Sequence, residues 1–137
     1  MIKAFLFIIS ILVAFREIHV AGHFCDGEDF TVEYKGRFTC YGEPHGKAIM
    51  MVGQCKDGTN FCKMDRNTVQ NDNDVIEGTS GKLEDSDDEL YLIVTPFCGT
   101  CSKSFKLPIS ESGVNCGPSS GNVHDFGNVE LSEHCHN

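Results

Sequence analysis

The amino-acid sequence predicts an all-β domain of the sandwich or barrel class that is stabilised by disulfide bonds. Short stretches rich in β-branched and aromatic residues recur between turn residues. No stretch after residue 22 sustains the i, i+3, i+4 spacing of an amphipathic helix. The chain also holds eight cysteines, an even number that is typical of the disulfide framework of a secreted protein.

Seven segments carry the strand pattern, and they are separated by turn residues. The segment 89–97, "ELYLIVTPF", is the most apolar, so we expect it to be buried. "NTVQND" and "DVIEGT" lie in a polar, acidic region and are expected at sheet edges. The predicted strands are residues 30–41, 47–55, 67–72, 74–79, 89–97, 102–109 and 124–132.

The first and last of these strands contain the most specific local signals. In residues 30–41, Val32 and Tyr34 alternate with polar neighbours, and Gly36 then interrupts the pattern. A glycine inside a strand predicts a bulge or a close approach of another backbone. In the last strand, Val129 and Leu131 share one face by the period of two, so we expect them in the core.

The first 22 residues have the layout of a secretory signal peptide. Lys3 precedes an apolar run from Ala4 to Phe15, which is shorter than the roughly 20 residues of a membrane span. The small residues of "VAG" fit a cleavage site that leaves His23 first, and an uncleaved anchor fits this short run less well. We therefore expect residues 1–22 to be a signal peptide and residues 23–137 to form one secreted domain that is not transmembrane.

The strong acidity of the chain limits its partners. The formal net charge is −9, and it becomes −10 when Lys3, Arg16 and Glu17 leave with the signal peptide. An acidic surface repels nucleic acid and anionic lipid at long range. We expect no nucleic-acid partner, and an anionic ligand would need a local basic patch or a bridging cation.

The cysteines are expected to form disulfides, and their pairing stays open. Eight cysteines allow about 105 pairings, among which the sequence does not choose. Cys55 and Cys62 can bridge each other across the compact turn "CKDGTNFC", and Cys135 can tie the C-terminus to the domain. The eight are Cys25, Cys40, Cys55, Cys62, Cys98, Cys101, Cys116 and Cys135.

Cys98 and Cys101 form the C-x-x-C spacing of thiol–disulfide oxidoreductases. Those enzymes place the motif where a strand leads into a helix, because the helix N-terminus stabilises the thiolate. Here we expect a strand on both sides of the motif and six further cysteines in the chain. A structural role is therefore favoured, and a secreted oxidoreductase that uses these two cysteines is the alternative.

Two metal sites can also be drawn from the sequence. Zinc would need both C-x-x-C cysteines together with two histidines near the C-terminus, but these cysteines are expected to form disulfides. Calcium would use the alternating carboxylates of "LEDSDDEL", although no EF-hand pattern is present, and a solvated acidic loop is favoured. The zinc candidates are Cys98, Cys101, His134 and His136, and the calcium candidates are Asp85, Asp87 and Glu89.

The order of the segments resembles the nematode transthyretin-like family. Its first motif, G-x-L-x-C-x-G-x-P, is matched by "GRFTCYGEP" at residues 36–44. Pro96 stands where the family has a histidine, "NDNDVIEG" replaces its middle turn, and three cysteines are additional, namely Cys25, Cys55 and Cys62. The matching residues are Gly36, Phe38, Cys40, Gly42, Pro44, Gly78, Cys98, Leu107, Pro108, Asp125, Gly127 and Leu131.

The resemblance implies a transthyretin-like two-sheet β-sandwich with Greek-key connections, about seven strands and no cofactor. It also implies a non-enzymatic, extracellular role, such as bridging phosphatidylserine on dying cells to a phagocyte receptor, or another signalling role. The partners would be a protein receptor, a phospholipid head group or both, and edge strands could pair into a homodimer.

The chain ends in "ELSEHCHN" and lacks the C-terminal Y-R-G-S of the related hydroxyisourate hydrolases. No nucleophile motif is present, and a cysteine-rich protease inhibitor is a further alternative.

Overall fold

The computed structural model describes residues 24–44, 47–56, 58–65, 69–71, 74–117 and 121–135. The expected signal peptide, its cleavage site and His136 lie outside the described residues. Within these ranges, no helix is both long enough and apolar enough to cross a membrane. The described chain contains ten strands and two short 3-10 helices, η1 (Glu111–Gly113) and η2 (Leu131–His134).

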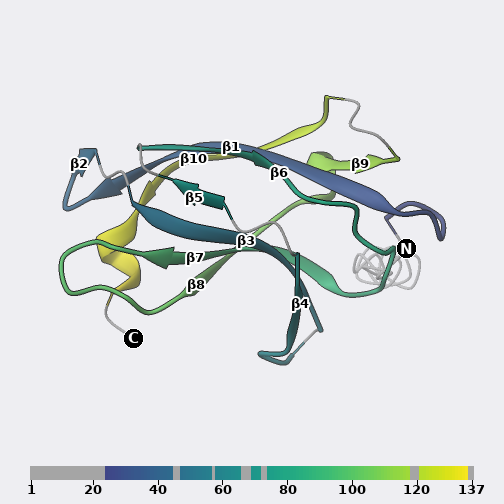
Figure 1. Ribbon diagram of the computed structural model, residues 1–137, viewed down its shortest axis with the longest axis horizontal. Helices are drawn as coiled ribbons and strands as arrows, with labels where there is room; N and C mark the ends of the chain where they lie inside the picture. The colour runs from purple at the N-terminus through teal and green to yellow at the C-terminus, as the bar shows by residue number, and fades with distance from the viewer. Residues whose placement is uncertain are drawn as a thin grey trace, which may run out of the picture.

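Strand β1 (Phe30–Cys40) is the centre of the first sheet. It pairs in parallel with β10 (Val123–Glu130) along most of its length. It pairs antiparallel with β2 (Glu43–Pro44), β6 (Val75–Thr79) and β9 (Val114–Cys116). The N-terminal and C-terminal parts of the domain therefore lie side by side in one sheet (Figure 1).

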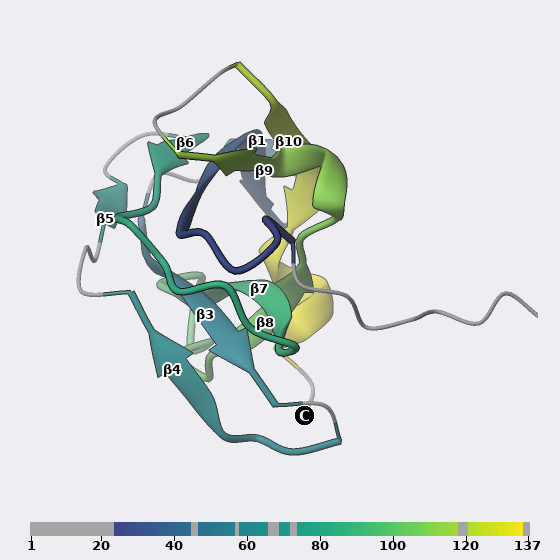
Figure 2. The ribbon, with the colours of Figure 1, turned by 90° about the vertical axis from the view of Figure 1, so that its right-hand side faces the viewer.

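Strand β3 (Ala48–Cys55) is the centre of the second sheet. It pairs antiparallel with β7 (Glu89–Pro96), β4 (Cys62–Met64) and β5 (Val69–Asn71), and β7 pairs with β8 (Phe105–Pro108). Figure 2 shows the two sheets as separate layers. The predicted all-β class is confirmed, and the arrangement is sandwich-like.

The seven predicted strands are all present, but the expected total of about seven is wrong. The described residues form ten strands, and the three that the sequence did not predict are β2, β4 and β9. Each of these three has only two or three residues, which is too short to show a period of two. They form because a neighbouring long strand offers hydrogen-bonding groups. This pairing depends on the folded arrangement of the chain and not on the local sequence.

The core lies between the two sheets and follows the predicted alternation. Large apolar side chains of β1 and β10 face those of β3 and β7, and each one stabilises the fold by roughly 1.5–3 kcal/mol when fully buried. Val129 and Leu131 are buried as predicted, although β10 ends at Glu130 and Leu131 begins η2. The buried set includes Phe30, Val32, Tyr34, Phe38, Met50, Val52, Ile76, Leu92 and Val94.

The interruption at Gly36 is a bulge with a close backbone approach. Lys35 lies opposite Asp125 and Arg37 lies opposite Asn128, so two residues of β10 face the single Gly36. A Cβ atom at Gly36 would lie 3.0 Å from the carbonyl oxygen of Gly127, which itself has φ +64°. The prediction from the sequence is confirmed, and a larger residue at this position would have to displace the neighbouring backbone.

Four disulfides cross-link the described chain, and it contains no free cysteine. Two of them connect the loop after β7 to the first sheet and its C-terminal extension, and one closes the hairpin between β3 and β4. Four bridges are consistent with an extracellular protein. The pairs are Cys25–Cys116, Cys40–Cys98, Cys55–Cys62 and Cys101–Cys135.

A carboxylate stabilises the turn between β1 and β2. Tyr41 and Gly42 form this two-residue turn with φ values of +53° and +81°, the signs of a type I′ turn. Their backbone N–H groups donate to the two carboxylate oxygens of Glu130 at 2.8 and 2.9 Å. The hydroxyl of Ser132 and the N–H of Gly42 lower the pKa of Glu130 to about 2.

This carboxylate predicts a specific dependence of stability on pH. The pKa of Glu130 falls from 4.5 to about 2 on folding, so its contribution is complete above pH 4.5 and is lost as the pH falls toward about 2. We expect the free energy of unfolding, measured in urea, to fall less steeply in this range for Glu130→Gln than for the wild type. Glu133→Gln changes an exposed neighbour and is the control. Parallel pH profiles for Glu130→Gln and the wild type would contradict the assignment.

Candidate functional site

The three predicted calcium ligands are not brought together. Asp85 turns toward the N-terminal segment, where its carboxylate accepts hydrogen bonds from the N–H groups of Phe24 and Gly27. Glu89 begins β7 and accepts the hydroxyl hydrogen bond of Tyr91. The segment around Asp85 and Asp87 is not a strand, so alternating positions do not share a face. Among the described residues, no group of three candidate ligands could hold a metal ion.

The predicted zinc set and the C-x-x-C motif are also separated. Cys98 is bonded to Cys40 and Cys101 is bonded to Cys135, so the two motif cysteines do not form a disulfide with each other. His134 stacks on the ring of Phe105, with ring centroids 3.9 Å apart. Both cysteines therefore cross-link the domain, as their structural interpretation predicted.

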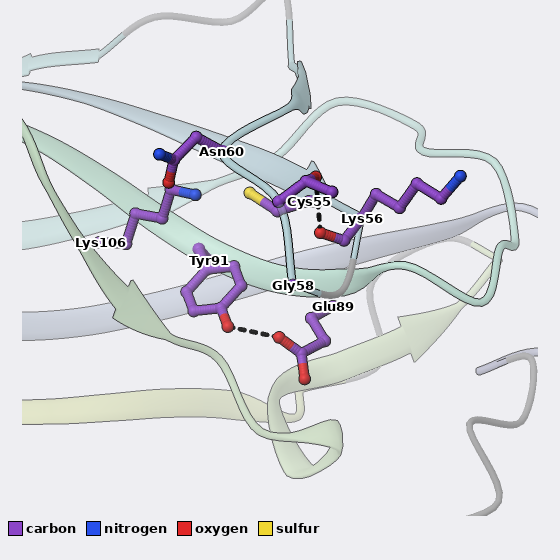
Figure 3. A pocket seen from close by; sticks show the side chains of 8 residues that line it. Cys55, Lys56, Gly58, Asn60, Glu89, Tyr91 and Lys106 are labelled. Atoms are coloured by element: carbon purple, nitrogen blue, oxygen red, sulfur yellow. Dashed lines mark hydrogen bonds between the residues drawn. The ribbon is translucent and has the colours of Figure 1, made fainter.

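A polar site lies at one end of the second sheet, beside the hairpin between β3 and β4. It is an open cavity of about 220 Å³. Figure 3 shows the lining side chains, which come from three strands and the hairpin turn. Its lining consists of Cys55, Lys56, Gly58, Thr59, Asn60, Glu89, Tyr91 and Lys106.

The hairpin side of this cavity is held by a disulfide and by turn hydrogen bonds. Cys55 and Cys62 lie directly opposite each other on β3 and β4 and are bonded, as the sequence suggested. Between them, the N–H of Lys56 donates to the carbonyl of Phe61 at 3.1 Å. The N–H and the hydroxyl of Thr59 both donate to the carbonyl of Lys56, at 3.1 and 2.9 Å. The disulfide and these hydrogen bonds hold the described residues of the turn in place.

The sheet side of the cavity carries side chains of both charges. Lys106 on β8 lies opposite Ile93 in the register, which places it diagonally across from Tyr91 on the same face. Its ammonium nitrogen lies 5.6 Å from the centroid of the Tyr91 ring, and the Tyr91 hydroxyl donates to Glu89. Lys56 also lines the cavity, although its side chain is directed away from Tyr91 and Lys106 in Figure 3.

Large apolar side chains project from the hairpin next to these charges. Phe61 is 75% exposed and Met64 is 42% exposed, although both are residues that a soluble domain usually packs. Met64 lies opposite Gly53 and so stands on the outer face of the sheet. Lys63, between them, forms an ion pair of 2.6 Å with Glu84. The end of this sheet therefore combines exposed apolar groups with a polar, charged cavity.

Sequence reasoning identified the turn "CKDGTNFC" but not the cavity. The one local signal was Phe61, an aromatic residue in an otherwise polar loop. Lys106, Tyr91 and Glu89 join the site only through the pairing of β7 with β8. Comparison of the chain with family models, with curated proteins and with solved structures finds no match.

The disulfides should differ in their contribution to stability according to the loops that they close. Cys55–Cys62 spans 7 residues and Cys40–Cys98 spans 58. The loop-entropy relation gives about 2 kcal/mol for the first bridge and about 4 kcal/mol for the second. We expect Cys55→Ala/Cys62→Ala to fold with a free energy of unfolding lowered by about 2 kcal/mol, measured in guanidinium without reductant.

The double variant Cys40→Ala/Cys98→Ala is the matched comparison, and it should lose about twice as much. Equal losses for the two double variants would contradict the assignment of Cys55–Cys62 as a local bridge that shapes only the hairpin.

Proposed function

We propose that this protein is a secreted, non-enzymatic binding protein that recognises the head group of a serine phospholipid on cell surfaces. In this role it bridges the lipid to a receptor in the clearance of dying cells. The observation that supports the proposal is the charged cavity beside Phe61, whose lining includes Lys56, Lys106 and Glu89.

The charges of the cavity complement those of this head group. A serine phospholipid carries a phosphate and a carboxylate, which are negative, and an ammonium group, which is positive. Lys56 and Lys106 match the two anions, and Glu89 matches the cation. Such charge-assisted hydrogen bonds are stronger than neutral ones. A cavity of about 220 Å³ accommodates a small polar head group but not an acyl chain.

The exposed apolar residues explain how the cavity would reach a membrane. Phe61 and Met64 extend from the same hairpin and would enter the boundary between head groups and acyl chains, where aromatic and long side chains bind favourably. The net charge of −9 opposes adsorption elsewhere on the surface. The hairpin is thus the part of the described chain best suited to approach an anionic membrane.

We further propose that the two sheets form a transthyretin-like Greek-key sandwich. The residues that carry the family resemblance are brought together in pairs, which supports this assignment. Gly36 and Gly127 face each other at the bulge, and Cys40 is bonded to Cys98. Pairing of edge strands into a homodimer stays a prediction of the sequence.

Vesicle binding tests the lipid contact. We expect flotation with vesicles of phosphatidylcholine containing phosphatidylserine, and not with phosphatidylcholine alone, in the presence of a chelator. Each lysine near an anionic membrane contributes about 1 kcal/mol, so Lys56→Ala/Lys106→Ala should bind roughly 30-fold more weakly. Phe61→Ser should also weaken binding, whereas Lys35→Ala on the other sheet should not. Unchanged binding of Lys56→Ala/Lys106→Ala would contradict the proposal.

Head-group selectivity tests the role of Glu89. Because its carboxylate would face the ammonium of the serine group, Glu89→Gln should lose preference for phosphatidylserine over phosphatidic acid by about tenfold. Binding to the two lipids is compared on vesicles of equal surface charge. Glu77→Gln, on the other sheet, is the control. If Glu89→Gln keeps the wild-type preference, the head group is not read in this cavity.

A further inference from the structure

Tyr41 occupies a position in which a tyrosine is unexpected. It is the first residue of the type I′ turn and has φ +53°, a conformation that favours glycine, asparagine and aspartate. Its side chain is 68% exposed, so burial in this domain does not compensate for the strained backbone. The fold alone therefore gives no reason for an aromatic residue here.

The structure nevertheless holds this aromatic residue in one place. Glu130 fixes the backbone of the turn through the two hydrogen bonds already described. The ring lies beside Gly99, because a Cβ atom on Gly99 would be 3.6 Å from Cε2 of Tyr41. The disulfide from Cys40 to Cys98 joins the residues just before these two. The side chain is thus presented to solvent in a prearranged position.

A second exposed aromatic residue stands at the same disulfide. Phe97 follows β7, immediately precedes Cys98 and is 46% exposed. Its N–H donates to the carbonyl of Lys47 at 3.1 Å, which fixes the start of the loop. Rigid aromatic side chains in fixed positions are the residues that most often dominate the affinity of protein interfaces.

We propose that Tyr41 and Phe97 form the docking surface for a folded cell-surface protein, one with an apolar pocket flanked by basic groups. This inference rests on the proposed function and supplies the receptor contact of the bridge. Carboxylates favour a partner with basic groups: Glu43 and Glu133 are both exposed at this end, beside an exposed cation, Lys47. The two carboxylates match a basic rim on a protein.

The two proposed contacts lie at opposite ends of the second sheet. The hairpin follows the end of β3, and Phe97 follows the end of β7, which runs antiparallel to it over eight residue pairs. At about 3.3 Å per residue, this separates the two ends by roughly 25 Å. In Figure 1, β2 and the loop after β7 are at the left-hand end, away from the hairpin of β4. Both ligands can therefore bind at once.

The variant Tyr41→Asn tests this inference without disturbing the fold. Asparagine is preferred at this turn position, so we expect unfolding in urea at an unchanged or higher midpoint. Binding to phosphatidylserine vesicles should be unchanged. The fluorescently labelled variant should bind at least tenfold more weakly to phagocytes from the organism that produces this protein. Its ability to tether vesicles to those cells should weaken to the same extent. Tyr41→Phe keeps the ring and should bind cells as the wild type does, whereas Phe97→Ser should weaken that binding.

The outcomes separate this inference from the lipid proposal. If the wild type fails to bind vesicles, the lipid proposal fails, and direct binding to cells still decides the role of Tyr41. The proposed docking surface would be contradicted if Tyr41→Asn bound cells as tightly as the wild type does. It would also be contradicted if the wild type did not bind cells. Trypsin removes proteins from the cell surface but leaves its lipids. If binding survives this treatment and increases with exposed phosphatidylserine, Tyr41 contacts lipid, and the proposal of a protein partner is wrong.

Discussion

The two disulfides that connect the loop after β7 to the first sheet and its C-terminal extension are the constraint on which the rest of the structure depends. Cys40 at the end of β1 is bonded to Cys98, and Cys135 after η2 is bonded to Cys101. Side-chain packing alone would otherwise hold the sheets together at this end. Both bridges restrict the unfolded chain, and both fix one short loop, in which the N–H of Cys101 also donates to the carbonyl of Cys98 at 2.9 Å. The C-x-x-C spacing lets that loop contribute two cross-links in different directions.

A rigid centre allows both ends of the domain to expose side chains that a less constrained fold would bury. At one end the Cys55–Cys62 bridge supports Phe61 and the charged cavity, and at the other the Cys40–Cys98 bridge supports Tyr41 and Phe97. Strands β3 and β7 connect the two ends and carry fully buried residues along their length. Loops and turns carry binding groups most readily when a scaffold of this kind fixes their bases.

The parts that could be predicted from the sequence are those with local causes. The alternation in residues 30–41, the glycine at position 36 and the buried segment 89–97 each report a period of two or a backbone requirement within a few residues. The parts that could not be predicted depend on contacts across the sheets. Glu130 reaches Tyr41 across 89 residues, and Lys106 meets Tyr91 only after β7 and β8 pair in one register. The cysteine pairing is of the same kind, because spacing alone does not select among the possible partners.

The acidity of the chain gives the proposed pair of contacts a selective advantage. Net repulsion from an anionic membrane and the attraction of two lysines are both screened over about 10 Å at 0.1 M salt, whereas the aromatic residue contributes only at contact. Each end alone would therefore bind weakly. When lipid and receptor are both present, binding at one end raises the effective concentration of the other ligand, so that the combined affinity exceeds either one. A rigid domain of roughly 25 Å between the contacts loses little conformational freedom in forming such a bridge. In the proposed bridge, two weak contacts on a rigid scaffold would confine stable binding to places where both ligands occur together.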